Sequence, residues 1–167
     1  MESYGCRRYL ALGRRTGWGV GVKLLIVLGS GGHTTEMLRL VDLLGPQYEY
    51  QYLVATDDEL SVKRIRVPGN VYRAVRPRWK TTRLPMVILR TLLSAWQALV
   101  ALVRVRPRAI ISTGPGPAVP ASLLAKCLGI KVIYIETGSR VFALSTSGKI
   151  LYRFADLFLV QWPELES

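Results

Sequence analysis

Cysteine is scarce in this chain, and acidic residues are missing from a long central stretch. The two cysteines, Cys6 and Cys127, lie far apart, which excludes a disulfide framework and the close spacing of a metal-binding motif. We therefore expect a protein of a reducing compartment that has no metal site and no cofactor.

Long apolar runs are also missing. No stretch of roughly 18 uncharged apolar residues is present, so the sequence predicts no membrane-spanning helix. Residues 1–22 are basic, and the short apolar run within them is too short for a signal peptide. We expect a poorly ordered basic tail over 1–22 and one folded domain over 23–167, because half of the 167 residues are hydrophobic (50%).

Between Ser61 and Ile135 the chain has fourteen Lys or Arg and no Asp or Glu, and its net charge is +12. Such a charge suits a solvated surface, nucleic acid, anionic lipid or a phosphorylated substrate. Nucleic acid is disfavoured, because the basic stretch flanks an apolar helix and no nucleic-acid-binding motif is present. We expect a membrane surface and a phosphorylated substrate as partners, and no nucleic acid.

Short apolar segments alternate with helical patterns along the chain. This alternation is typical of a parallel sheet that helices cover on both faces, so the sequence predicts an α/β fold. The expected strands are 23–28, 48–55, 70–75, 108–112, 131–135 and 157–160, and the expected helices are 34–44, a short helix or loop within 57–65, 81–105, a helix ending at 128, and 147–155.

The most informative motif is a glycine turn that follows the apolar run 24–28 and opens a helix. Glycines let the backbone approach a ligand, and a helix N-terminus offers N–H groups and a partial positive charge, which suits a diphosphate. Thr34 stands where the dinucleotide-binding motif has its last glycine, and no P-loop Lys follows. A tight connection without a ligand is the alternative. The residues expected to bind the diphosphate are Gly29, Ser30, Gly31, Gly32 and Thr34.

Two further turns follow predicted strands and should meet the first at one sheet edge. Gly114 and Gly116 lie in a proline-stiffened turn that either wraps the same phosphorylated group or is an ordinary strand-to-helix loop. In the third turn, Arg140 is expected to bind the diphosphate. Glu136 is expected to be a base or a hydroxyl-binding group, or else a carboxylate that pairs with an arginine to fix the loop.

The long helix predicted over 81–105 has two interpretations. It is either a core helix with a basic rim or a helix that lies on a membrane surface, with arginines on anionic headgroups. Its apolar stripe consists of Leu84, Val87, Ile88, Leu92, Ala95, Trp96, Leu99 and Val103. The residues expected to face the membrane are Arg76, Arg78, Lys80, Arg83 and Trp96.

Several motifs in order give the chain a family resemblance. Together they resemble the acceptor-binding, membrane-associated subunit of the two-part UDP-GlcNAc transferase of asparagine-linked glycosylation, and the glycine turn that ends in His33 is similar to that of MurG, a one-chain GT-B enzyme. Bacterial relatives of that subunit act in exopolysaccharide assembly. The motifs are 29–37, 70–78, 112–120, 134–137 with Arg140, 144–145 with 147–150, and 160–163.

The resemblance implies a Rossmann-like domain that forms the N-terminal half of a split GT-B glycosyltransferase. It implies a polyprenyl-diphosphate sugar as acceptor, a separate small donor-binding subunit, and transfer of GlcNAc from UDP-GlcNAc through a β-1,4 link to dolichyl-diphosphate GlcNAc. Members of the family continue past residues 162–163. Eukaryotic members usually also carry an N-terminal membrane-spanning helix, which residues 1–22 do not supply. We therefore expect peripheral attachment to the cytoplasmic face of the endoplasmic reticulum, or of the plasma membrane in a prokaryote.

The acceptor hydroxyl must lose a proton when it attacks the sugar. His33 is the expected base because imidazole moves protons near neutral pH, and Glu136 is the runner-up or its orienting partner. The alternatives are a bacterial exopolysaccharide transferase subunit and a non-catalytic membrane adaptor for the donor-binding subunit. A self-contained nucleotide-binding domain is disfavoured, because neither nucleotide motif is complete.

Overall fold

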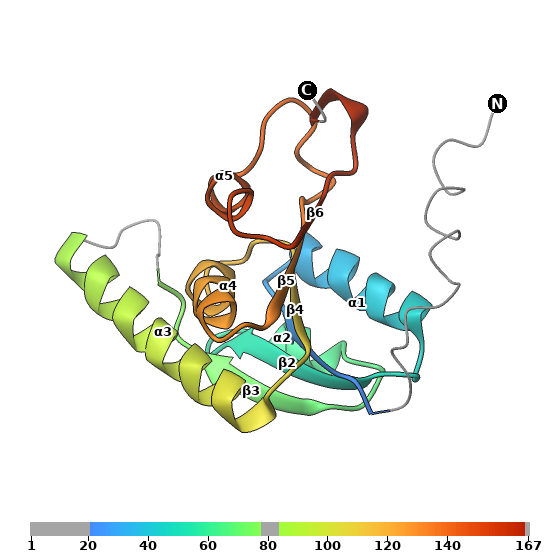
Figure 1. Ribbon diagram of the computed structural model, residues 1–167, viewed down its shortest axis with the longest axis vertical. Helices are drawn as coiled ribbons and strands as arrows, with labels where there is room; N and C mark the ends of the chain where they lie inside the picture. Colours follow the sequence, from blue (N-terminus) through green and yellow to red (C-terminus); the bar gives the residue numbers. More distant parts are fainter. Residues whose placement is uncertain (1–20, 78–83, 166–167) are drawn as a thin grey trace.

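The computed structural model describes residues 21–77 and 84–165. Its centre is a six-stranded, fully parallel sheet with the strand order β3-β2-β1-β4-β5-β6 (Figure 1). The strands are β1 Lys23–Val27, β2 Glu49–Ala55, β3 Asn70–Ala74, β4 Ala109–Ser112, β5 Lys131–Ile135 and β6 Leu157–Leu159. All six expected strands are confirmed, each within one residue of the predicted ends.

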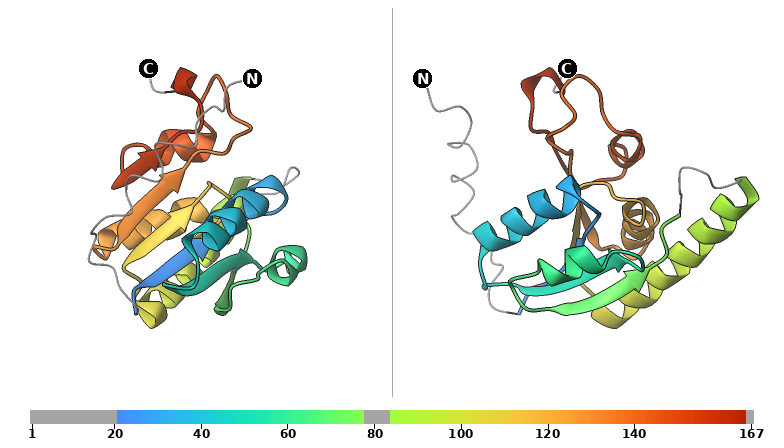
Figure 2. Two further views of the ribbon diagram at one scale, coloured as in Figure 1. Left: turned by 90° about the vertical axis from the view of Figure 1, so that its right-hand side faces the viewer. Right: turned by 180° about the vertical axis from the view of Figure 1, so that it is seen from behind.

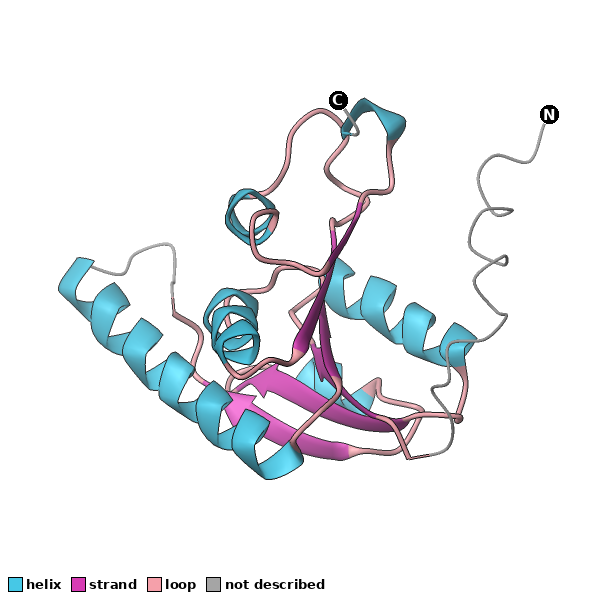
Figure 3. Cartoon of the chain, in the orientation of Figure 1, coloured by secondary structure: helices cyan, strands magenta, loops and turns pink. Residues whose placement is uncertain are grey.

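Helices follow most of the strands, as expected for parallel pairing. They are α1 Gly32–Leu44, α2 Glu59–Lys63, α3 Leu84–Val105, α4 Ala118–Cys127, α5 Thr146–Leu151 and the short 3₁₀ helix η2 Pro163–Leu165 (Figure 3). The predicted helix 147–155 is wrong at its C-terminal end. The chain leaves the helix at Tyr152 because Asp156 is tied to β5: its N–H donates to Val132 O (2.8 Å), and its Oδ2 accepts from Val132 N–H (3.0 Å).

Two apolar cores lie on opposite faces of the sheet. On one face α1 and α2 pack against β1, β2 and β4 around Ile26, Met37 and Tyr52. On the other face α3 and α4 pack around Leu25, Leu102 and Ile110 (Figures 1 and 2). Since the central strands are covered on both sides, Leu24–Val27 is buried at every position, which is why this strand is apolar without alternation.

Helix α3 packs differently from the predicted core stripe. Small residues bring its C-terminal half close to α4 and the sheet, and Ala98, Ala101 and Leu102 are buried. The stripe members Ile88 and Trp96 are exposed by 56% and 63%, together with Met86, Leu89, Leu92, Leu93 and Val103. The interpretation of that stripe as a core face is therefore wrong. The first turns of α3 stand clear of the sheet (Figure 1).

By length and composition alone, Pro85–Val105 is long and apolar enough to cross a membrane, although 22% of its most apolar window is buried. The expectation of no spanning helix did not anticipate this, because Arg90 interrupts the apolar run. A span through the whole helix would pull Ala98 and Leu102 out of the core. The expected tail and the residues Arg78, Lys80 and Arg83 lie outside the described residues, apart from positions 21 and 22.

Candidate functional site

The carboxyl ends of β1, β4 and β5 place three turns next to one another. Val27 pairs with Ser112 and Ile111 pairs with Ile133, so turn 1 (29–34), turn 2 (113–117) and turn 3 (136–140) share one sheet edge. His33 joins the first two, because its Nδ1 lies 3.2 Å from Thr113 Oγ1. The two glycine turns thus meet at the only histidine of the chain.

Turn 1 leaves the N-terminus of α1 open. Ser30, Gly31 and Gly32 are exposed, and Gly31 has φ +69°, a conformation that favours glycine. No side chain caps the helix at Gly31. The first N–H groups of a helix have no partner inside it, so this end offers donors and a partial positive charge to an anion.

The other members of turn 1 serve packing. A Cβ on Gly29 would stand 2.5 Å from Pro115 Cβ, so only glycine lets turns 1 and 2 approach this closely. Thr34 is fully buried, and its hydroxyl lies 2.7 Å from Ser61 Oγ of α2. The Thr34 side chain therefore anchors α1 and takes no part in the open edge.

The two glycines of turn 2 differ in surroundings. Gly114 has φ +86°, and a Cβ there would stand 2.5 Å from the Tyr134 hydroxyl oxygen. Ser147 Oγ donates to Gly114 O (2.9 Å), which fixes this part of the turn. Gly116 is exposed and faces Arg76 and Pro77. Of the two, Gly116 is the one with access to a ligand.

Glu136 is buried and its carboxylate is fully used by neighbouring segments. Oε2 accepts from Ser145 N–H (2.9 Å) and from Ser145 Oγ (3.1 Å), and Oε1 accepts from Thr137 N–H (3.1 Å). Gly148 leaves the room for Oε2, because a Cβ there would overlap it. This geometry favours the loop-fixing alternative, with backbone and serine donors in place of the expected arginine.

Tyr134 packs on the same carboxylate. Its hydroxyl lies 3.0 Å from Ser145 Oγ and donates to Glu136 Oε1 over 3.4 Å. Burial raises the pKa of Tyr134 to about 12, so the phenol stays protonated at physiological pH. The cluster therefore holds turn 3 against the 145–148 segment.

Sequence reasoning missed Glu36. Its Oε1 accepts from Gly138 N–H (3.0 Å) and from Thr137 Oγ1 (3.2 Å), which links the first turns of α1 to turn 3. Glu36 Oε2 is buried without a hydrogen-bond partner among the described residues. The only feature of the sequence that could have indicated this role of Glu36 is the position of an acidic residue one helical turn after the glycine motif. Arg140 is exposed on turn 3, and its N–H donates to Thr137 O (3.0 Å).

Arg76 lies at the carboxyl edge, beside turn 1. Its Nη1 donates to Ser30 Oγ (3.3 Å), and its Nε lies 3.5 Å from Asp57 Oδ2. Of the residues expected to face a membrane, Trp96 is on the exposed face of α3, whereas Arg76 is close to the glycine turns.

The family model for oligosaccharide biosynthesis protein Alg14 like proteins matches residues 24–167. The chain belongs to this family. It is 39% identical over 167 residues to UDP-N-acetylglucosamine transferase subunit ALG14 of Homo sapiens, covering 87% of this chain and 77% of that protein. It is also 39% identical over 160 residues to the subunit alg14 of Schizosaccharomyces pombe, covering 85% and 76%. The expected family resemblance is confirmed.

Solved structures share the fold of this Alg14-like chain. MurG of Acinetobacter baumannii matches with a TM-score of 0.69 and 18% identity over 86% of this chain and 42% of MurG. A UDP-N-acetylglucosamine 2-epimerase matches with a TM-score of 0.67 and 15% identity over 86% and 43%. The Alg14-like chain therefore has the Rossmann-like fold of one half of a GT-B structure, as expected.

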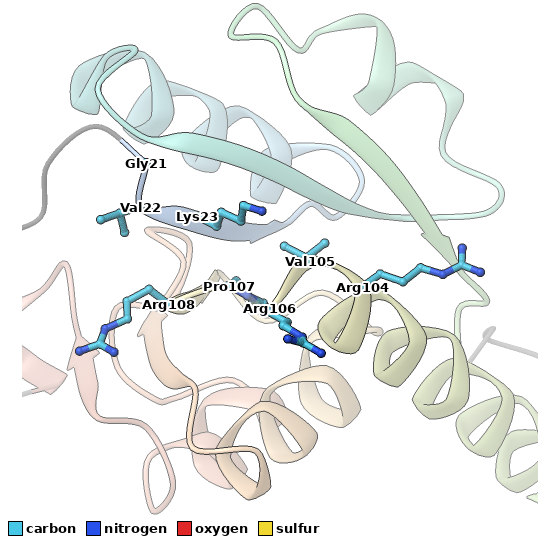
Figure 4. Close-up of a pocket in the computed structure, with 8 residues that line it drawn as sticks. All are labelled: Gly21, Val22, Lys23, Arg104, Val105, Arg106, Pro107 and Arg108. Carbon is cyan, nitrogen blue, oxygen red and sulfur yellow. The ribbon is translucent and has the colours of Figure 1, made fainter.

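A basic hollow of about 620 Å³ lies at the opposite, amino edge of the sheet in this Alg14-like chain. Its charged lining residues are Lys23, Arg104, Arg106 and Arg108. Figure 4 shows that these side chains fan apart. They do not converge on one small ligand. Arg104 lies in the last turn of α3, and Arg106 and Arg108 follow the helix end, where cations complement the helix dipole. Among residues 21–77 and 84–165, no three His, Cys, Asp or Glu side chains cluster as metal ligands.

Replacing Glu136 tests its role in the Alg14-like fold. We expect Glu136→Ala to lower the free energy of unfolding by about 2–4 kcal/mol, because buried donors of Ser145 and Thr137 lose their acceptor. Urea unfolding followed by circular dichroism measures it. Glu59→Ala is the control, since exposed Glu59 pairs with Arg73 (2.8 Å) and should cost about 0–1 kcal/mol. An unchanged stability with lost turnover would instead make Glu136 a catalytic group.

Proposed function

We propose that this chain is the acceptor-binding subunit of a heteromeric glycosyltransferase. The reaction adds GlcNAc from UDP-GlcNAc to a polyprenyl-diphosphate-linked GlcNAc through a β-1,4 link, with dolichyl diphosphate as the eukaryotic carrier. The family supports the reaction class, because relatives at 39% identity are named UDP-N-acetylglucosamine transferase subunits. The observation that carries the acceptor role is the open N-terminus of α1, with His33 held between turns 1 and 2.

In this proposal, the backbone N–H groups of Gly31 and Gly32 hold the acceptor diphosphate, together with Gly116 and Arg140. The acceptor hydroxyl oxygen attacks the anomeric carbon of the donor sugar. The bond from that carbon to UDP breaks, and His33 takes the hydroxyl proton. Glu136 supports the site indirectly by fixing turn 3, because its carboxylate is buried and accepts a hydrogen bond from Ser145 N–H.

A separate donor-binding subunit completes the site. In this proposal the chain supplies one wall of a two-lobed cleft, which is supported by the match of its fold to 42% of the MurG chain. We expect no transfer by the purified chain alone and full activity once a small donor-binding subunit is added. The measurement is transfer of radiolabelled GlcNAc to a short-chain polyprenyl-diphosphate GlcNAc. Robust transfer by this chain alone would refute the proposal.

Peripheral docking on the cytoplasmic face of a membrane would bring the site to its lipid-linked acceptor. The exposed apolar side chains of α3 support this placement, and the arginines at its C-terminal end offer further contacts to anionic lipid. The same observations favour one second candidate, a membrane adaptor that recruits the donor-binding subunit without taking part in chemistry. The two candidates differ in whether turnover depends on His33.

A further inference from the structure

Arg76 joins two loops that the proposed function assigns to one ligand. Resting on that function, we propose that Arg76 binds the acceptor diphosphate directly and that Asp57 is its positioning residue. The inference goes beyond the glycine turns, because it gives the diphosphate a full positive charge at a defined place in the fold.

The position of Arg76 carries the inference. It lies two residues after β3, at the same carboxyl edge as turns 1 and 2. Its Nη1 donates to Ser30 Oγ of turn 1 over 3.3 Å. Its Cγ would stand 3.4 Å from a Cβ on Gly116 of turn 2, so the side chain passes directly over that glycine. The Arg76 side chain thus borders both turns that are proposed to wrap the diphosphate, with its aliphatic stem beside turn 2 and its guanidinium at turn 1.

Asp57 holds the guanidinium in this place. It follows β2, and its Oδ2 lies 3.5 Å from Arg76 Nε. Both side chains are partly shielded, with 25% and 33% of their surface exposed. A long arginine side chain loses much rotamer freedom when it binds, and a carboxylate that already restricts it reduces that loss. Arginine stays protonated beside a phosphate in any accessible pH range.

The chemistry of a diphosphate fits this arrangement. Backbone N–H groups of a helix end supply only partial charge, and they reach one side of the ligand. A planar guanidinium donates two parallel hydrogen bonds to phosphate oxygens, which adds both charge and orientation. Lysine supplies a point charge without this geometry. A diphosphate can engage the helix end and Arg76 at the same time, whereas a monophosphate can fully engage only one of them. Arg76 would therefore distinguish a diphosphate from a monophosphate better than the glycine turn alone.

The competing interpretation places Arg76 on the membrane as one of several cations that meet anionic lipid. Binding of a soluble ligand distinguishes the two interpretations. Geranyl diphosphate and geranyl monophosphate carry the headgroup chemistry without a bilayer, and phosphatidylserine vesicles offer a charged surface without a diphosphate. Binding of each to the full chain is measured by calorimetry and by co-sedimentation.

The variants are Arg76→Gln, Arg76→Lys and Asp57→Asn, with Arg73→Gln as the matched control. Arg73 lies on β3, and Arg73→Gln removes the same charge as Arg76→Gln. Arg73 pairs with Glu59 and with Thr56 O, away from the glycine turns. We expect Arg76→Gln to weaken geranyl diphosphate binding about tenfold or more, because a charge-assisted contact to phosphate is lost. Arg76→Lys should lie between it and wild type, and Asp57→Asn should weaken binding less than Arg76→Gln.

Monophosphate and vesicle binding should change about twofold or less in Arg76→Gln, and Arg73→Gln should match wild type in all assays. In the assembled transferase, Arg76→Gln should raise the KM for the acceptor with kcat nearly unchanged. If wild type binds geranyl diphosphate and Arg76→Gln binds it equally well, the inference is overturned while the proposed function stands. If Arg76→Gln instead loses only vesicle binding, Arg76 is a membrane cation. If wild type binds no diphosphate, both proposals fail.

Discussion

Replacing His33 by alanine should lower kcat of the assembled transferase by about 10²–10⁴-fold, with little change in acceptor KM, because a positioned general base contributes on that scale. The ring is fixed through Nδ1, which lies 3.2 Å from Thr113 Oγ1. Nε2 has no partner among the described residues, so it is the nitrogen that can receive the acceptor proton. Single-turnover measurements with the donor-binding subunit present separate this step from product release.

Thr113→Val is the matched variant for His33. It removes the hydroxyl that orients the ring and leaves the imidazole in place, so kcat should fall about tenfold, which is much less than for His33→Ala. Both variants should keep wild-type stability and vesicle binding, because His33 is half-buried at the edge of the sheet. Near-normal turnover of His33→Ala would remove the catalytic role and leave the membrane adaptor as the function of this chain.

Local signals made the sheet predictable. The run at 24–28 is apolar at every position because β1 is covered on both faces, and this pattern identifies a central parallel strand without any knowledge of its neighbours. The glycine turn then follows by chain order, since helix α1 must start after the strand ends. Parallel pairing places the ends of β1, β4 and β5 together, so the convergence of the three turns was also predictable.

The burial of α3 was not predictable in the same way. Large apolar residues occur around most of its circumference, so periodicity gives no single core face. The size of the side chains determines which face of α3 packs inward. Ala98 and Ala101 allow close approach to α4 and the sheet, whereas the larger Ile88, Leu92 and Trp96 remain exposed. A sequence of this kind is compatible with both interpretations until the packing partner is known.

The candidate site was predictable in its loops and less so in its side chains. Glu136 follows a strand, as a catalytic acid often does, but its burial depends on Ser145, which lies nine residues further on. The contacts of Arg76 with Ser30 and of Glu36 with Gly138 span 46 and 102 residues. No local pattern specifies such distant partners, so only the fold reveals them.

Replacing Ile88, Leu92 and Trp96 together by glutamine should weaken binding to anionic vesicles by about 100-fold or more. These residues follow one another at intervals of four along one face of α3, and each is more than half exposed, by 56%, 64% and 63%. Full burial of such a side chain in an apolar phase is worth roughly 1.5–3 kcal/mol, so even partial insertion of three gives the expected loss. Co-sedimentation with phosphatidylserine vesicles at low salt measures it.

The matched control is Leu43→Gln with Leu60→Gln, because these leucines are 85% and 71% exposed on α1 and α2, away from α3. They should leave vesicle binding unchanged. Arg104, Arg106 and Arg108 add a charge term of about 1 kcal/mol each near an anionic surface. High salt should remove that term, since the Debye length is ~3 Å at 1 M. A helix that lies on the surface is then released by salt and the triple substitution together, whereas one that spans the bilayer resists both. Wild-type protein that ignores anionic vesicles, or a triple variant that binds as tightly, would show that α3 is not the docking element.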